Sequence, residues 1–106
     1  MTLKAIGSRG DWFATIEGER VACAWSWWLT GNHYRDPVIE AEKGKWPKYI
    51  AAIREQRKVA LTGKKETKDG KWERDGYIGL FRVTNVVVTS NTLEFDLIQP
   101  RIASLE

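Results

Sequence analysis

The chain has 106 residues, a formal net charge of +3, and ordinary shares of apolar (42%) and charged (29%) residues. This length suits one domain with a single hydrophobic core. No stretch approaches the roughly 20 apolar residues that span a bilayer, and a lone cysteine excludes an internal disulfide. The first residues also lack an apolar signal core. We therefore expect one soluble, cytoplasmic domain over residues 1–106, with no membrane contact.

The first third of the chain predicts three strands and two turns. Short runs of strand-forming residues occur at 3–7, 12–16 and 20–29. Residues 8–11 predict a turn, and 17–19 predict a tight hairpin in which glycine accepts a positive φ. In the third strand, the face that carries Ala22 and Ala24 is small, which predicts that another element packs closely against it.

Tryptophan is unusually frequent, with six in the chain. Side chains alternate between the two faces of a strand, so Trp25 and Trp27 would share one face and Trp28 would lie on the other. We predict that three of the six indoles belong to the core: Trp12, Trp25 and Trp46. Trp28 and Trp72 are the indoles that we expect to be exposed.

The rest of the chain predicts one helix and three further strands. Residues 46–56 repeat apolar side chains at helical spacing, with a proline in the first turn. Strands are expected at 58–62, 77–88 and 92–98, whereas 31–44 is a long polar loop and 63–76 a lysine-rich loop or mobile hairpin. The fold class is α+β: a strongly bent mixed sheet or partly closed β-barrel of about five to six strands, covered by the helix at 46–56.

Four segments resemble an uncharacterised family of small bacterial proteins, to which no function is assigned: 18–25, 31–37, 57–62 and 75–83. More loosely, the strand Gly-Tyr-Ile-Gly-Leu-Phe-Arg-Val at 76–83 is similar to a barrel strand of the PUA-like superfamily, which includes ASCH, EVE and YTH domains. This resemblance implies a small α+β barrel that binds RNA or modified bases. The amino terminus carries no signature of that superfamily, so the resemblance assigns no site residue.

Positive charge is concentrated in residues 43–74, which hold 11 of the 17 lysines and arginines but only four acidic residues. Such a segment suits an anionic partner. The alternative is a solvated surface that keeps the protein soluble. The side chains expected to contact phosphate are Lys43, Lys45, Lys48, Arg54, Lys64, Lys65, Lys68 and Lys71.

Aromatic side chains beside a polar loop suit a flat ligand such as a nucleobase. The side chains expected to bind it are Trp28, Asn32, His33, Tyr34, Arg35 and Trp72. Together with the basic segment, they predict a binding module for nucleic acid or a nucleotide-like ligand.

Two other functions remain open. A small hydrolase would use His33 as general acid or base, with Asp36 orienting it in a cleft. A protein-interaction or homodimer module would use surplus tryptophans, or an uncovered edge of the strand at 77–88. We expect no metal site and no cofactor, because the sequence holds neither a zinc ligand set nor a phosphate-binding glycine motif.

Overall fold

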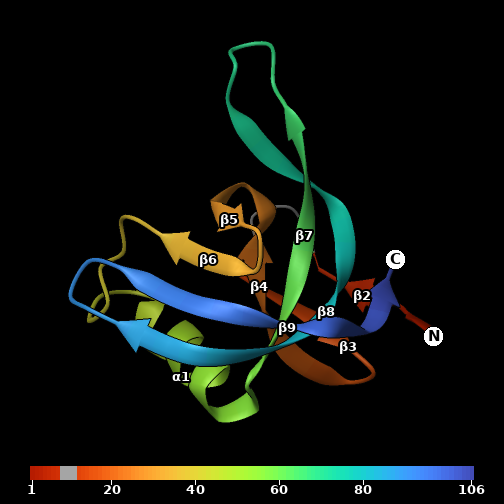
Figure 1. The fold of residues 1–106 in the computed structure, drawn as a ribbon, viewed down its shortest axis with the longest axis horizontal. Helices are drawn as coiled ribbons and strands as arrows, with labels where there is room; N and C mark the ends of the chain where they lie inside the picture. Colours follow the sequence, from red (N-terminus) through yellow and green to blue (C-terminus); the bar gives the residue numbers. More distant parts are fainter. Residues whose placement is uncertain (8–11) are drawn as a thin grey trace.

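The computed structural model describes residues 1–7 and 12–106, so the turn expected at 8–11 lies outside the described residues. Over the described residues, nine strands form one mixed sheet, and one α-helix packs against it (Figure 1). The elements in chain order are β1 (Thr2–Leu3), β2 (Ala5–Ile6), β3 (Phe13–Ile16), β4 (Glu19–Trp25), the 3-10 helix η1 (Ser26–Trp28), β5 (Leu29–Thr30), β6 (His33–Asp36), α1 (Trp46–Gln56), β7 (Lys58–Glu66), β8 (Trp72–Val88) and β9 (Leu93–Leu105). The small domain with one helix and a mixed sheet is confirmed, but the expected count of five to six strands is wrong.

The strands lie side by side in the order β2-β3-β4-β7-β8-β9-β6-β5, and β1 pairs in parallel with the end of β9. β4 and β7 are parallel, which requires a crossover, and the crossover contains η1, β5, β6 and α1. β8 pairs with β7 between Trp72 and Arg82, and with β9 between Gly79 and Val88. This pairing does not test the homodimer that the sequence leaves open, so the homodimer stays a prediction.

The sheet is buried on two faces, and β4 shows this most clearly. Ala22 and Ala24 belong to the apolar cluster that includes Ile53 of α1, on what we call the helix face. Val21 and Cys23 belong to a second cluster on the opposite side, the far face. The prediction that another element packs against the small residues of this strand is confirmed, and that element is α1.

The helix has the predicted bounds. Pro47 lies in its first turn, where a missing N–H costs no hydrogen bond. Arg57 adopts a left-handed conformation (φ 53°) immediately after the helix and donates its N–H to the Ile53 carbonyl at 2.9 Å. The hairpin between β3 and β4 is also confirmed, with positive φ at Glu17 and Gly18.

The tryptophan run differs from its prediction because the strand ends early. β4 stops at Trp25, and η1 begins at Ser26, so the two-residue alternation does not continue through Trp27. The tighter turn instead stacks the rings of Trp25 and Trp27, with centroids 5.7 Å apart and planes 8° apart.

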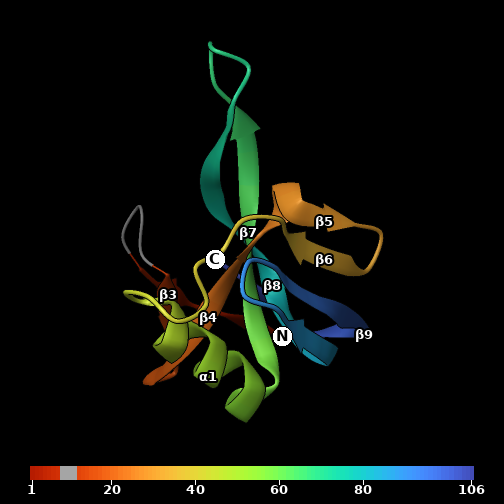
Figure 2. The same cartoon turned by 90° about the vertical axis from the view of Figure 1, so that its left-hand side faces the viewer.

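The segment expected as a loop or mobile hairpin is a regular two-stranded ribbon, which we call the arm (residues 63–76). It is the outer part of β7 and β8 and projects from the body of the molecule (Figures 1 and 2). Register shifts mark its base around Thr62, where the backbones approach so closely that a Cβ on Gly63 would collide with the Asp75 carbonyl oxygen. Gly63 therefore permits the bend from which the arm starts.

Candidate functional site

One face of the arm carries a tryptophan between cations. Lys64 and Arg74 are directly opposite each other in the ladder, and Trp72 lies two residues before Arg74, on the same face. The Lys64 ammonium is 4.5 Å from the centroid of the Trp72 ring, a distance typical of a cation–π contact. Trp72 is 48% exposed, so much of its indole remains accessible.

The same face continues into the body at the base of the arm. The Arg74 guanidinium lies 5.8 Å from the Trp25 ring and 4.7 Å from the Tyr77 ring, and it donates to the Tyr77 hydroxyl. Trp25 in turn stacks on Trp27. We call this sequence of rings and cations the indole row: Trp27, Trp25, Arg74, Lys64 and Trp72. Trp25 packs against the far-face cluster, so the row lies on the side away from α1.

The structure divides the predicted basic segment between two places. Residues 43–58 hold six cations and one acid, and they lie at and around α1. The arm holds five cations and four acids, and on it Lys65 pairs with Glu73 at 3.2 Å. The excess positive charge therefore belongs to the helix side, whereas the arm offers exposed rings and individual cations.

The remaining cations of that segment are spread along the surface. Lys43 pairs with Glu40 at 3.7 Å, whereas Lys45 and Lys48 lie at the start of α1. Arg54 is exposed in the last turn of α1. Lys68 and Lys71 are exposed at the tip of the arm, where the Thr67 N–H donates to the Lys71 carbonyl at 2.7 Å.

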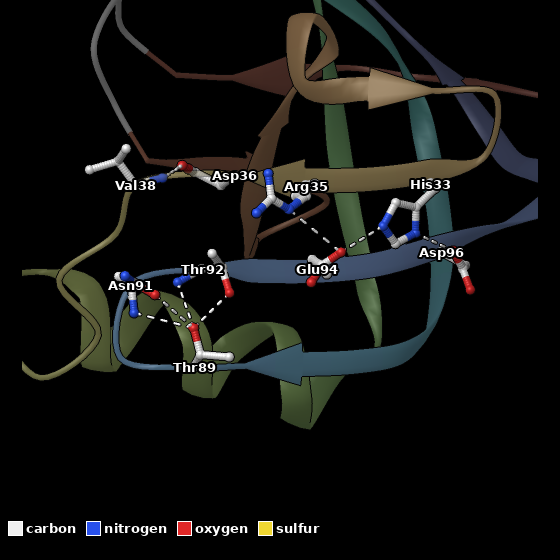
Figure 3. Close-up of polar contacts among 9 residues, drawn as sticks. All are labelled: His33, Arg35, Asp36, Val38, Thr89, Asn91, Thr92, Glu94 and Asp96. Carbon is white, nitrogen blue, oxygen red and sulfur yellow. Dashed lines mark hydrogen bonds and ion pairs between the residues drawn. The ribbon is translucent and has the colours of Figure 1, made fainter.

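His33 lies between two carboxylates on the surface of the sheet (Figure 3). Its Nδ1 is 2.8 Å from an Asp96 oxygen, and its Nε2 is 2.9 Å from a Glu94 oxygen. These hydrogen bonds, first with Asp96 and then with Glu94, raise the pKa of His33 above 6.5. The protonated ring then donates from both nitrogens and links β6 to β9.

The cluster extends to a third strand. Asn85, at a bulge in β8 with φ 54°, donates its side-chain N–H to the second Asp96 oxygen at 3.0 Å. That bond and the one from His33 lower the pKa of Asp96. Because both nitrogens of His33 already bond carboxylates, the cluster acts as a cross-strand link on the outer surface rather than as an open acid–base site.

Two predicted site residues are in different surroundings from those expected. Tyr34 is fully buried and stacks on Phe95, with centroids 4.6 Å apart, so it is a core residue and not a ligand contact. Its hydroxyl oxygen accepts a hydrogen bond from the Trp25 N–H at 3.3 Å. The sequence expectation placed it on a loop, but the strand β6 turns it inward.

Asp36 is also buried, and its pKa is raised by that burial. One of its oxygens accepts from the Val38 N–H at 3.3 Å (Figure 3). Along β6 exposed and buried residues alternate, so His33 and Asp36 lie on opposite faces of the strand. The expected catalytic pairing of these two residues is therefore wrong: the acidic partners of His33 are Glu94 and Asp96.

Trp28 is 37% exposed, so the exposure predicted for Trp28 and Trp72 is confirmed. Asn32 is exposed, and its side-chain oxygen accepts from Gln99 at 3.2 Å. Arg35 is exposed as well, with its Nε 3.8 Å from Glu94. Trp28 thus lies in η1, Asn32 immediately before β6 and Arg35 within β6.

The residue that the sequence prediction missed is Arg74, which connects Trp25 to the arm. Its signal is the alternation Trp72-Glu73-Arg74, which places the ring and the guanidinium on one face if the segment is a strand. The segment was expected as a loop or mobile hairpin without assigned strands, so no faces could be assigned to its side chains.

No group of three or more His, Cys, Asp or Glu side chains among the described residues is arranged to hold a metal ion. Across the same part of the chain, no helix is both long and apolar enough to span a membrane. No protein-family model, curated protein or solved structure matches this chain.

Proposed function

We propose that this protein is a nucleic-acid-binding module that holds a single strand along the indole row. The observation that carries the proposal is the series of rings and cations on one face of the arm. Single-stranded nucleic acid is bound by aromatic faces for bases together with cations that follow the phosphates. Both are present here within a ribbon that projects from the body and is accessible from solvent.

Stacking is the main source of affinity in this proposal. A base on the exposed part of the Trp72 indole contributes about 1–3 kcal/mol. Lys64, Lys68 and Lys71 supply positive charge for phosphates, while Arg74 keeps Trp25 and the arm in register. The PUA-like resemblance favours RNA as the natural strand.

Fluorescence titration with single-stranded RNA, DNA and duplex tests this proposal. With three lysines on phosphates, the logarithm of the association constant should fall with the logarithm of salt concentration with a slope of about −2. Trp72→Ala should weaken single-strand binding about tenfold or more, because it removes a stacking face. Lys64→Ala should weaken it less and make the salt slope shallower.

Lys4→Ala is the matched control, since Lys4 is an exposed lysine outside the arm. It should leave binding and salt slope unchanged. Binding that is lost equally with Lys4→Ala and Lys64→Ala would show general charge attraction instead of a site. Retention of full affinity by Trp72→Ala would remove the indole row from the proposal.

A further inference from the structure

A hollow of about 510 Å³ lies on the helix face, and none of the residues that line it belongs to the arm. Its floor is the face of β3 and β4 that carries Phe13 and Arg20, and its wall is the start of α1, with Lys45 and Lys48. Trp12 lies at one end. The volume is within the roughly 300–1,000 Å³ of small-molecule sites.

The lining of this hollow is basic. Among the described residues, the lining includes Arg20, Lys45 and Lys48 and no acidic side chain. Glu19, which precedes Arg20 in the chain, forms an ion pair with Lys58. The ion pairs found in the described part of the chain involve none of the three lining cations. Three cations around one concave surface therefore produce a positive potential that an anion would neutralise.

Two aromatic rings, those of Trp12 and Phe13, also line the hollow and are fixed in place. Trp12 packs edge-on against Trp46 at 4.5 Å and against Tyr49 at 5.4 Å. Phe13 lies beneath the Arg20 guanidinium, 4.5 Å from its ring centroid, and also meets Tyr49 edge-on. These contacts hold both rings and the guanidinium in position before any ligand arrives, which lowers the entropic cost of binding.

The start of α1 supports the same conclusion. Acidic residues are favoured at the positive end of a helix dipole, yet the first turn has none, and Lys45 and Lys48 add positive charge there. Lys45, at the cap position, makes no side-chain capping hydrogen bond. Both features disfavour the start of the helix on its own, and an anion bound in the hollow would offset that cost in stability.

We infer that the hollow binds a small phosphorylated ligand with a flat aromatic ring, of the mononucleotide class. Arg20, Lys45 and Lys48 contact the phosphate, and the ring lies against Trp12 and the Arg20–Phe13 pair. This site is distinct from the indole row, because Phe13 and Arg20 are on the helix face and the row is on the far face.

Calorimetric titration with adenosine monophosphate, adenosine and inorganic phosphate tests the inference. The monophosphate should bind at least tenfold more tightly than adenosine, which lacks the anion, and than phosphate, which lacks the ring. The double variant K45A/K48A should weaken monophosphate binding at least tenfold. Lys4→Ala, at an exposed lysine that neither lines the hollow nor lies on the arm, is the matched control and should leave monophosphate binding unchanged.

Both side chains are exposed, so we expect K45A/K48A to fold like the native chain, and thermal denaturation checks this. If adenosine binds as tightly as the monophosphate, or if K45A/K48A binds like the native chain, the inference is overturned. Absence of heat with all three probes also overturns it. Single-strand binding by K45A/K48A, measured in parallel, separates this site from the arm: its loss together with monophosphate binding would mean one shared surface.

Discussion

The two halves of β7 and β8 belong to the same pair of strands but lie in different environments. The inner half is covered on both faces, and three consecutive residues of β7 are buried there: Val59, Ala60 and Leu61. The outer half is the arm, where three consecutive residues of β7 are exposed: Lys64, Lys65 and Glu66. An isolated two-stranded ribbon is marginally stable in water. The arm is therefore ordered by its ladder hydrogen bonds, its cation–π contacts and the bend at Gly63.

This difference separates what stabilises the protein from what it offers to a ligand. In the inner half, burial of apolar surface decides which residues are tolerated. In the outer half, side chains contribute little to the core, so a tryptophan and several cations can be displayed there at a small cost in stability. The predictions below test that separation, starting with the largest expected effect.

Truncation of a core side chain should be far more costly than truncation of the arm's indole. Ile53 is fully buried in α1, so Ile53→Ala should lower the free energy of unfolding by about 2–5 kcal/mol. Trp72→Ala should change it by less than about 0.5 kcal/mol, because that side chain is half exposed. Urea denaturation measures both. A comparable loss for the two variants would mean that the arm is part of the core's cooperative unit.

Gly63→Ala tests the bend at the base of the arm. The new Cβ would collide with the Asp75 carbonyl oxygen, so the backbone must shift. We expect a loss of about 1–3 kcal/mol, typical of overpacking, with the arm amides losing hydrogen-exchange protection before those of β9. Gly70→Ala, in the turn at the tip, is a comparison without a backbone collision: φ is +75° there, so its loss comes from the left-handed conformation and should leave the base of the arm protected. Uniform loss of protection across the sheet in Gly63→Ala would contradict a local bend.

Asp36→Asn is expected to change the free energy of unfolding less than Gly63→Ala does, and to raise it at pH 7 instead of lowering it. Burial raises the pKa of Asp36 above its ordinary 3.8, so the folded state disfavours the charged carboxylate. The resulting cost is absent below pH 3.8 and is complete above the raised pKa. Asparagine keeps the oxygen that accepts from Val38, so the variant should be more stable than the native chain at pH 7. Urea unfolding of the variant and of the native chain should give different midpoints at pH 7 and nearly the same midpoint at pH 3.

The elements that the sequence predicted well are those with strong local patterns. The helix at 46–56 combines an apolar stripe with a proline in its first turn, and the hairpin after β3 has Gly18 at a positive φ. The strand that ends at Trp25 was predicted too long. The residues of η1 include two tryptophans, which are typical of strands, although their backbone forms a 3-10 helix. Strands of two residues, such as β1 and β5, carry no period at all and are recognised only through their partners.

The candidate site was predicted in its parts but not in its arrangement. The exposure of Trp72 followed from its polar neighbours in the sequence, whereas that of Trp28 was predicted from a strand alternation that ends at Trp25. The burial of Tyr34 did not follow from its neighbours, because it depends on β6 pairing with β9, more than fifty residues later. For the arm, the sequence left a loop and a mobile hairpin as alternatives for a physical reason: a ribbon with water on both faces needs no apolar alternation, so its sequence resembles a loop.

The buried tyrosines have a consequence for the protein at alkaline pH. Burial raises the pKa of both Tyr34 and Tyr49 above the ordinary 10.0, so neither phenol ionises readily while the fold is intact. Their contribution to stability is complete below pH 10 and is lost as the pH rises beyond it. In the unfolded chain both phenols ionise near pH 10. The absorbance of their phenolates is thus an intrinsic optical signal that reports loss of the core without any added label.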